Sequence, residues 1–309
     1  MKTLIFTHKN DIDGVGCAIL AKIAYFDVEF VLCETFELKT VIAKYFENDS
    51  IYSFERIFVT DLWPKDETIS KFICDEKLKD KFFIFDHHKT SLDSPYSKES
   101  FATVKISDEK GLCCGTSLFY KYLVEQNLIE ADNSAIIDFV ELTRRHDTWE
   151  WKNIYNDEKS RELSLLFDAV GCYKYIEMMY AKLTTRDYFY FTETERCLID
   201  IRIENIKQKS IEYSNNIQYK EILGLKAGVL YIEYSYRNEI AEYFRENNFD
   251  MDFVMFIVPE KKTVSYRSIK DGINVRAIAE HFGGKGHDKA ATNPISDKKM
   301  EALLETLLS

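Results

Sequence analysis

The amino-terminal half of the chain alternates short apolar runs with segments of helical periodicity, and this alternation limits the possible folds more than any other feature. The expected strands are residues 4–6, 28–32, 56–60 and 81–85, and the expected helices are residues 15–25, 38–46 and 67–73. Strands that are apolar throughout and are separated by helices are typical of a parallel sheet with both faces covered. We therefore predict an α/β fold built on a parallel sheet.

The later part of the chain first becomes helical and then resumes the alternation. Residues 117–184 have mostly helical patterns, and residues 186–216 have the polar, helix-compatible sequence of a connecting helix. Beyond it we expect strands at 228–234, 252–258 and 263–268, and helices at 238–247, 275–282 and 296–308. The predicted organisation is a larger domain over 1–185, a helical linker over 186–216 and a smaller α/β domain over 217–309.

Composition and charge exclude several classes of protein. Of the 309 residues 46% are hydrophobic, which is enough for a core, and the formal net charge of -11 disfavours binding to long nucleic acids. The amino terminus does not resemble a signal peptide, and no apolar segment approaches the length of a membrane span. The seven cysteines lack Cys-x-x-Cys spacing and indicate reduced thiols. We expect a cytoplasmic protein, with no membrane partner, whose polar helices allow a homodimer without requiring one.

Residues with metal-binding side chains follow three of the expected strands. The carboxyl ends of parallel strands share one edge of a sheet, where ligands bind, so these side chains are expected to converge. The set is His8, Asp11, Asp13, Asp61, His87 and His88, and Asp147 would join it from a helix end.

Carboxylates that converge repel one another, and a divalent cation removes that conflict. Mixed imidazole and carboxylate ligands suit Mn²⁺ or Fe²⁺ better than Ca²⁺ or a structural Zn²⁺. The number of ligands favours two metal ions, which in such sites lie roughly 3.5–4 Å apart. The alternative for Asp13 or Asp61 alone is a cap at the start of a helix.

A second constellation is the glycine-rich segment from Phe282 to Ala291. Its three glycines in four positions let the backbone approach a ligand closely, and amides of such a turn at a helix start bind anions. Positive charge nearby comes from Arg267, Arg276, Lys285 and Lys289. The alternative is a plain helix cap followed by a turn. Together with His287 and the Ala290-Ala291 pair, the segment favours phosphate or nucleotide binding.

In combination these residues resemble the DHH family of phosphoesterases, which is named for the tripeptide found here at Asp86-His87-His88. The resemblance covers nearly the whole chain. Its four motifs match residues 8–14, Asp61, residues 86–88 and residues 145–147, and residues 283–291 with Arg267 match the DHH-associated carboxyl-terminal domain. The spacing of His8 before Asp11, and Lys285 and Thr292 at positions where glycine is usual, depart from the pattern.

The resemblance implies a role for each residue. His8, Asp11 and Asp61 would hold one Mn²⁺, and Asp13, Asp61, His87 and Asp147 the other, with Mg²⁺ or Fe²⁺ as substitutes. His88 would contact the substrate phosphate and Asp86 would support it. In the smaller domain the nucleotide would be bound across a cleft by Arg267, Gly284, Gly286 and His287.

The predicted function is therefore a Mn²⁺-dependent phosphodiesterase of the oligoribonuclease type, which hydrolyses very short RNA or linear dinucleotides. Alternatives within the same chemistry are a 3′-phosphoadenosine 5′-phosphate phosphatase, a cyclic nucleotide or dinucleotide phosphodiesterase, and an exopolyphosphatase. A nucleotide-binding regulator on a degenerate scaffold would have lost metal-binding aspartates, yet Asp11, Asp13, Asp61 and Asp147 are all present.

Overall fold

A computed structural model of the chain describes residues 1–296, which form two compact units. The division falls between Ile199 and Asp200, inside helix α8 (Glu193–Ser214). The helix expected at 296–308 runs into residues 297–309, which lie outside the described part of the chain. Within residues 1–296, no helix is both long and apolar enough to cross a membrane.

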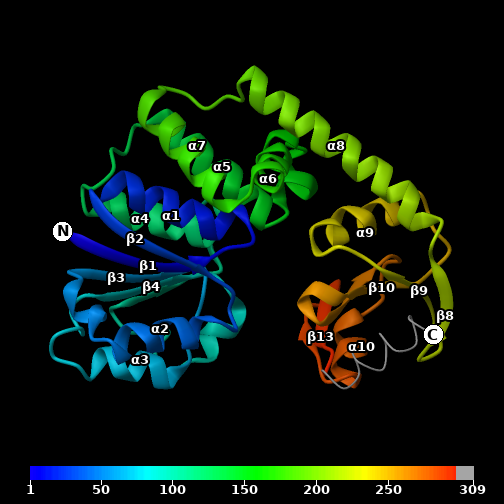
Figure 1. The fold of residues 1–309 in the computed structure, drawn as a ribbon, viewed down its shortest axis with the longest axis horizontal. Coiled ribbons are helices and arrows are strands. Elements are labelled where there is room, and N and C mark those ends of the chain that lie inside the picture. Colours follow the sequence, from blue (N-terminus) through cyan, green and yellow to red (C-terminus); the bar gives the residue numbers. More distant parts are fainter. Residues whose placement is uncertain (297–309) are drawn as a thin grey trace. The chain divides into compact units, whose positions relative to one another are not determined.

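The first unit is built on the expected parallel sheet (Figure 1). Its five strands lie in the order β2-β1-β3-β4-β5, and every neighbouring pair is parallel. Their bounds are β1 Lys2–His8, β2 Asp27–Cys33, β3 Arg56–Thr60, β4 Phe82–Asp86 and β5 Ala102–Val104, and a small hairpin joins β6 (Ser107–Asp108) to β7 (Gly111–Leu112). The predicted α/β class is confirmed.

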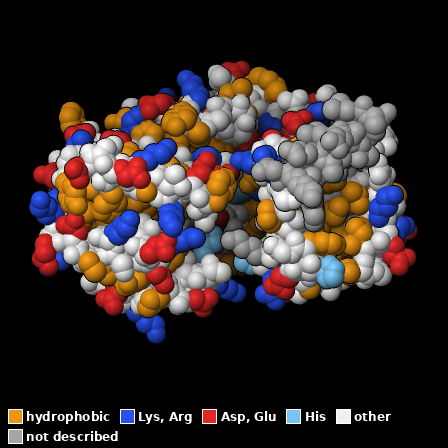
Figure 2. Space-filling view, turned by 60° about the horizontal axis from the view of Figure 1, so that its bottom comes forward, with side chains coloured by type: hydrophobic (Ala, Val, Ile, Leu, Met, Phe, Trp, Pro, Cys, Tyr) orange, Lys and Arg blue, Asp and Glu red, His pale blue; other side chains and the backbone are white. Residues whose placement is uncertain are grey.

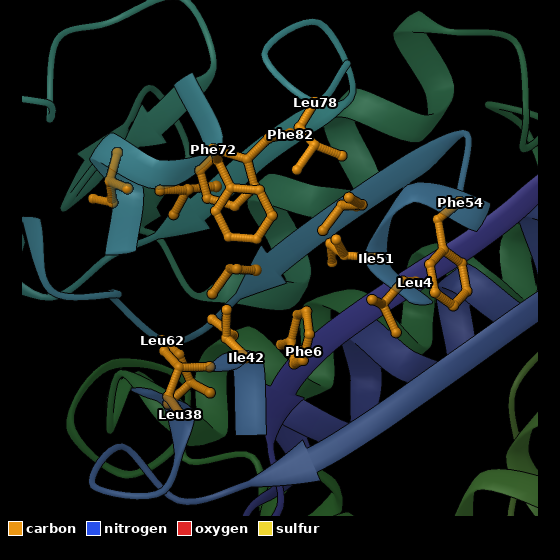
Figure 3. Packing of buried hydrophobic residues seen from close by; sticks show 14 of the residues in the cluster. Leu4, Phe6, Leu38, Ile42, Ile51, Phe54, Leu62, Phe72, Leu78 and Phe82 are labelled. Atoms are coloured by element: carbon orange, nitrogen blue, oxygen red, sulfur yellow. The ribbon is translucent and has the colours of Figure 1, made fainter. Parts of the chain in front are cut away.

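Helices cover both faces of this sheet, which is why its central strands are apolar at successive positions. In Figure 1, α2 (Leu38–Glu47) and α3 (Asp66–Ile73) lie on one face, and α1 (Ile12–Ala24) and α4 (Gly115–Glu125) on the other. Alternate strand residues point to opposite faces: Phe82 stacks on Phe72 of α3 at 4.0 Å between ring centres, whereas Phe58 meets Phe119 of α4 at 5.1 Å. Figure 3 shows the first of these two cores.

Helices follow the sheet in the second half of the unit. They are α5 (Ser134–Asp147), a π-helical turn (Trp151–Tyr155), α6 (Glu158–Val170) and α7 (Cys172–Thr185). Helix α8 begins at Glu193 rather than near residue 186, because Thr192 and Glu195 form a reciprocal cap at its start. Short 3-10 turns occupy Ser50–Ser53, Lys89–Asp93, Tyr234–Tyr236 and Pro259–Lys261.

The second unit contains a mixed sheet in the order β12-β13-β11-β10-β9-β8. Only the β9–β10 pair is parallel. The strands are β8 Gln218–Ile222, β9 Leu225–Tyr231, β10 Phe253–Val258, β11 Thr263–Ser268, β12 Lys285–Gly286 and β13 Ala290–Pro294, and the helices are α9 Arg237–Glu246 and α10 Val275–His281. β8, β12 and β13 were not predicted.

The expectation of a helix start at the glycine-rich turn is wrong. The turn ends α10: Gly283 has φ 78°, its amide donates to Glu280 O at 3.0 Å, and the amide of Gly284 donates to Ala279 O at 2.8 Å. This pattern closes a helix through a left-handed glycine. The chain then enters the β12–β13 hairpin, so the segment contains no helix amino terminus to bind an anion.

Candidate active site

The site lies where the connections of the parallel sheet change direction. β1 connects to β2 on one side, and the chain then returns to β3 on the other side of β1, which leaves a crevice at the carboxyl ends of the strands. His8 ends β1, Asp61 directly follows β3, and His87 and His88 directly follow β4. The structure therefore brings together side chains from three strands, as the sequence predicts.

Asp11 and Asp13 reach the same place from the start of α1. Asp11 caps this helix by accepting a hydrogen bond from the amide of Gly14 at 2.9 Å. Asp13 is buried, and its carboxylate accepts hydrogen bonds from the amides of Gly115 and Thr116, both at 2.7 Å, at the start of α4. The amino terminus of α4 thus fixes the orientation of the Asp13 carboxylate.

The close approach of α4 depends on glycine at residue 115. A Cβ atom there would lie 2.8 Å from Asp61 Cβ and 3.1 Å from Asp13 Oδ2. Gly14 is equally constrained, since a Cβ atom would lie 2.2 Å from His8 O. These two glycines let helix backbones pack directly against the residues of the site.

Asp61 and His87 stand at the centre of the cluster. Asp61 is buried and has φ 55°, a left-handed conformation that a non-glycine residue adopts only when its surroundings impose it. His87 Nε2 lies 3.3 Å from Asp61 Oδ1, 3.7 Å from Asp13 Oδ2 and 3.6 Å from Asp147 Oδ2. Asp147 comes from the last turn of α5 and completes the set of residues expected from the sequence.

The donor atoms of this cluster form a metal-binding site. Three groups have ligand atoms within 4.8 Å of one another: His8, Asp11 and Asp61; Asp13, His87 and Asp147; and Asp61, His87 and His88. The mixture of imidazole nitrogens and carboxylate oxygens, with no thiolate in these groups, matches the preference of Mn²⁺ or Fe²⁺.

Electrostatics support this assignment. Burial and the carboxylates of Asp13 and Asp11 raise the pKa of Asp61, and burial together with Asp13 raises the pKa of Asp147 to about 7. Burial alone would lower the pKa of the histidines, but Asp11 raises the pKa of His8 to about 12 and Asp61 raises that of His87 to about 11. The cluster therefore retains protons that a divalent cation would displace.

The metal-free protein is expected to lose thermal stability as the pH rises from 6 to 8. The elevated pKa values of His8 and His87 stabilise the fold fully below their ordinary value of 6.5, and this contribution declines above it. Asp147, with a pKa of about 7, also becomes charged over this interval. Melting temperatures measured in EDTA test this. In Mn²⁺ we expect the reverse trend, since metal binding requires deprotonated ligands. Identical trends with and without metal would contradict the assignment.

Asp86 is a support for His88 rather than a member of the metal-binding groups. It is fully buried, accepts a hydrogen bond from Ser91 Oγ, and lies with Oδ1 2.8 Å from His88 Nδ1. Although burial lowers the pKa of His88, Asp86 raises it to about 9. Because Nδ1 faces Asp86, Nε2 is the nitrogen of this half-exposed ring that can meet a substrate oxygen.

Four supporting residues were not predicted from the sequence. Gly115 and Thr116 hold Asp13, Ser91 holds Asp86, and Glu34 lies with Oε2 3.4 Å from His8 Nε2. The small residues Gly115, Thr116 and Ser117 at a helix start were the available signal for the first two. Glu34 and Ser91 belong to no pattern that distinguishes them from surface residues.

The residues expected to bind nucleotide in the second unit lie on neighbouring strands and on a turn. Arg267 is on β11 and pairs in register with Ala290 of β13, and Gly286 on β12 pairs with Ala291. His287 is exposed in the turn that joins β12 to β13. Gly284 lies in the turn after α10.

Arg267 has an unusual electrostatic environment. Its guanidinium donates to Asn238 Oδ1 at 2.9 and 3.1 Å and to Ser265 Oγ at 3.0 Å, both neutral acceptors. Burial and the nearby charges of Arg237 and Arg245 lower the pKa of Arg267 to about 9. Three arginines thus lie close together here, with Arg245 paired to Glu242.

Comparison with known proteins agrees with this geometry. No family model matches the chain. Oligoribonuclease NrnB of Bacillus subtilis is 31% identical over 299 residues, which are 96% of this chain and 74% of that protein. The chain belongs to the NrnB family of DHH phosphoesterases.

Two solved structures show the same fold. The pGpG-specific phosphodiesterase PggH of Vibrio cholerae has a TM-score of 0.54 and 13% identity, with 99% of this chain and 97% of that chain covered. Exonuclease RecJ bound to manganese has a TM-score of 0.55 and 15% identity, with 98% of this chain and 88% of that chain covered.

Proposed function

We propose that the protein is a Mn²⁺-dependent phosphodiesterase that hydrolyses very short oligoribonucleotides or linear dinucleotides to mononucleotides. One observation carries this proposal: the metal-binding groups around Asp61 occur in a chain that is 31% identical to an oligoribonuclease. The overall charge agrees with a short substrate, because a long strand would require a basic groove. Figure 2 shows acidic and basic side chains interspersed over the face in view.

The proposal includes two metal ions that share Asp61. His8, Asp11 and Asp61 would hold one, and Asp13, Asp61, His87 and Asp147 the other. Asp61 is suited to bridge because its two oxygens face different histidines: Oδ2 lies 3.7 Å from His8 Nδ1, and Oδ1 lies 3.3 Å from His87 Nε2. When bound, such a pair of ions lowers the pKa of a water and stabilises charge on the phosphoryl oxygens.

The protein's own groups would orient the phosphate. In the reaction, water adds to phosphorus and the bond from phosphorus to the leaving oxygen breaks. In the metal-free protein Asp86 raises the pKa of His88 to about 9, which favours a protonated ring whose Nε2–H would donate to a phosphate oxygen. Asp86 sets this orientation through Nδ1. In the second unit, Arg267, Gly284, Gly286 and His287 would bind the rest of the nucleotide.

Asp86→Asn is expected to lower kcat/KM for a dinucleotide by about 10-fold to 100-fold, the range typical of groups that hold catalytic ligands. Without the carboxylate the pKa of His88 should fall from about 9 towards its ordinary value, so the alkaline limb of the pH profile should move to lower pH. Ser91→Ala, which removes only one donor to Asp86, serves as the control with a smaller effect. A pH profile of the Asn variant that matches the wild type would rule out this role for His88.

A substrate panel tests the proposed function. We expect Mn²⁺-dependent turnover of the linear dinucleotide pApA and of RNA a few nucleotides long. The panel also contains 3′-phosphoadenosine 5′-phosphate, cyclic di-AMP and polyphosphate, which represent the three alternative activities. Turnover of polyphosphate alone would refute the proposal, and so would binding of nucleotides without turnover of any substrate.

A further inference from the structure

Trp149 is a bulky residue in a strained conformation beside the metal-binding site. It follows Asp147 by two residues, has φ 59°, and remains 46% exposed. A bulky side chain rarely adopts a left-handed backbone, so the surrounding structure must impose it. We propose that Trp149 is the stacking platform for one nucleobase of the substrate, an inference that rests on the proposed function.

A buried ion pair holds the loop that carries Trp149. Arg144 and Glu150 bracket the loop, and their side chains, 6% and 7% exposed, meet at 2.5 Å. Both side chains also bond to the backbone of Leu112. Arg144 Nη1 donates to the carbonyl of Leu112 at 2.9 Å, and the amide of Leu112 donates to Glu150 Oε1 at 3.2 Å. Because a buried pair with these additional hydrogen bonds is difficult to break, the backbone between its members is fixed.

The backbone of the loop is hydrogen-bonded from within as well. The amide of Thr148 donates to Arg144 O at 3.0 Å, and that of Trp149 donates to His146 O at 3.1 Å. The carbonyl of Trp149 accepts from the amide of Asn153 at 3.2 Å, in the π-helical turn that follows. Turns of this type are frequent at functional sites. The backbone that carries the indole is thus fixed by the same segment that carries Asp147.

A second tryptophan supports the indole from the protein side. Trp151 is 9% exposed. Its ring is nearly parallel to the ring of His146, with 6.4 Å between ring centres and 13° between ring planes. The ring centres of Trp151 and Trp149 are 6.3 Å apart. The indole of Trp149 thus contacts a buried ring and is still 46% exposed to solvent. A ring held in place before the ligand arrives loses little conformational entropy on binding.

The chemistry of a nucleobase matches this surface. Two residues span at most about 7 Å, so the backbone of Trp149 lies close enough to Asp147 for an indole directed towards the site to meet a base next to the phosphate. Stacking on an aromatic ring is sequence-tolerant, because every base has a π face, and it contributes about 5-fold to 150-fold in affinity per base. Trp149 would thus select for nucleotides over other phosphate esters without selecting among the bases.

The test compares intact pApA with two analogues in which one base is absent, using variants of Trp149. Trp149→Asn removes the ring and tolerates a positive φ, and Trp149→Phe retains an aromatic ring. Tyr173→Ala, which removes an aromatic side chain that is 67% exposed on α7, is the matched control. Thermal unfolding of each variant verifies that it is folded. Intrinsic fluorescence, titrated with AMP, reports binding independently of turnover.

In the wild type, kcat/KM for intact pApA should exceed kcat/KM for one of the abasic analogues. We expect Trp149→Asn to lower this ratio by at least about 5-fold. Trp149→Phe should retain most of this ratio, and Tyr173→Ala all of it. AMP should quench the fluorescence of the wild type and not that of Trp149→Phe. Equal losses on intact and abasic substrates, or quenching that persists without Trp149, would overturn the proposal. If the wild type turns over none of these substrates, the proposed function fails, and the fluorescence titration alone decides whether Trp149 stacks on a base.

Discussion

Asp61→Asn is expected to lower kcat/KM for a dinucleotide by about 1,000-fold or more, while raising the melting temperature of the metal-free protein. The loss follows because Asp61 is the one side chain that the proposal assigns to both metal ions, and each ion is worth several kcal/mol of transition-state stabilisation. Asparagine also accepts the left-handed conformation that Asp61 adopts, so the backbone should not change.

The gain in stability has a separate cause. Burial and the nearby carboxylates of Asp13 and Asp11 raise the pKa of Asp61. At neutral pH the metal-free fold must therefore either bury an unfavourable charge or take up a proton at Asp61, and both lower its stability. Asparagine removes this cost because it does not ionise. Asp49→Asn is the matched control, because Asp49 is exposed and has φ 57°, and we expect neither activity nor melting temperature to change there. An Asn variant at 61 that keeps its activity, or is less stable in EDTA, would contradict this account.

Gly115→Ala is expected to lower activity by about 100-fold and to weaken Mn²⁺ binding. The new methyl group would lie 2.8 Å from Asp61 Cβ and 3.1 Å from Asp13 Oδ2, so α4 must move away and take with it the amides that hold Asp13. Displacements of about 1 Å at a catalytic site cause losses of this size.

The control for Gly115→Ala is an overpacked position in the other unit. A Cβ at Gly228 would lie 2.5 Å from Met251 Sδ, so Gly228→Ala should also destabilise its unit, by about 1–3 kcal/mol. Unlike Gly115→Ala, it should leave the affinity for Mn²⁺ unchanged in a calorimetric titration. Equal Mn²⁺ affinities for the wild type and Gly115→Ala would show that close packing of α4 is not what positions the ligands.

The fold of the first unit was predictable because its strands are apolar at successive positions. β3 and β4 lie almost where expected, at Arg56–Thr60 and Phe82–Asp86. By contrast, β8 is a largely exposed edge strand with the sequence Gln-Tyr-Lys-Glu-Ile, in which no apolar pattern marks a strand. Its hairpin with β9 forms through the left-handed residues Leu223 and Gly224, a signal too local to stand out from ordinary loop sequence.

The site was predictable to the extent that it depends on strand ends. The parallel sheet alone explains why His8, Asp61 and His87 meet. The supports were not predictable, because the contact of Asp13 with α4 joins residues about a hundred positions apart and depends on helix packing. The glycine-rich turn follows the helix expected at 275–282, as predicted, but it does not begin a helix. Glycines that end a helix and glycines that begin one look alike until the position of the next element is known.

Metal dependence is the central claim, and one measurement tests it most directly. The protein is stripped of metal with a chelator, and hydrolysis of labelled pApA is followed before and after Mn²⁺ is returned. We predict no turnover before addition and full recovery as the bound metal approaches two ions per chain. Full turnover in the presence of the chelator, with no metal detected in the sample, would contradict the account.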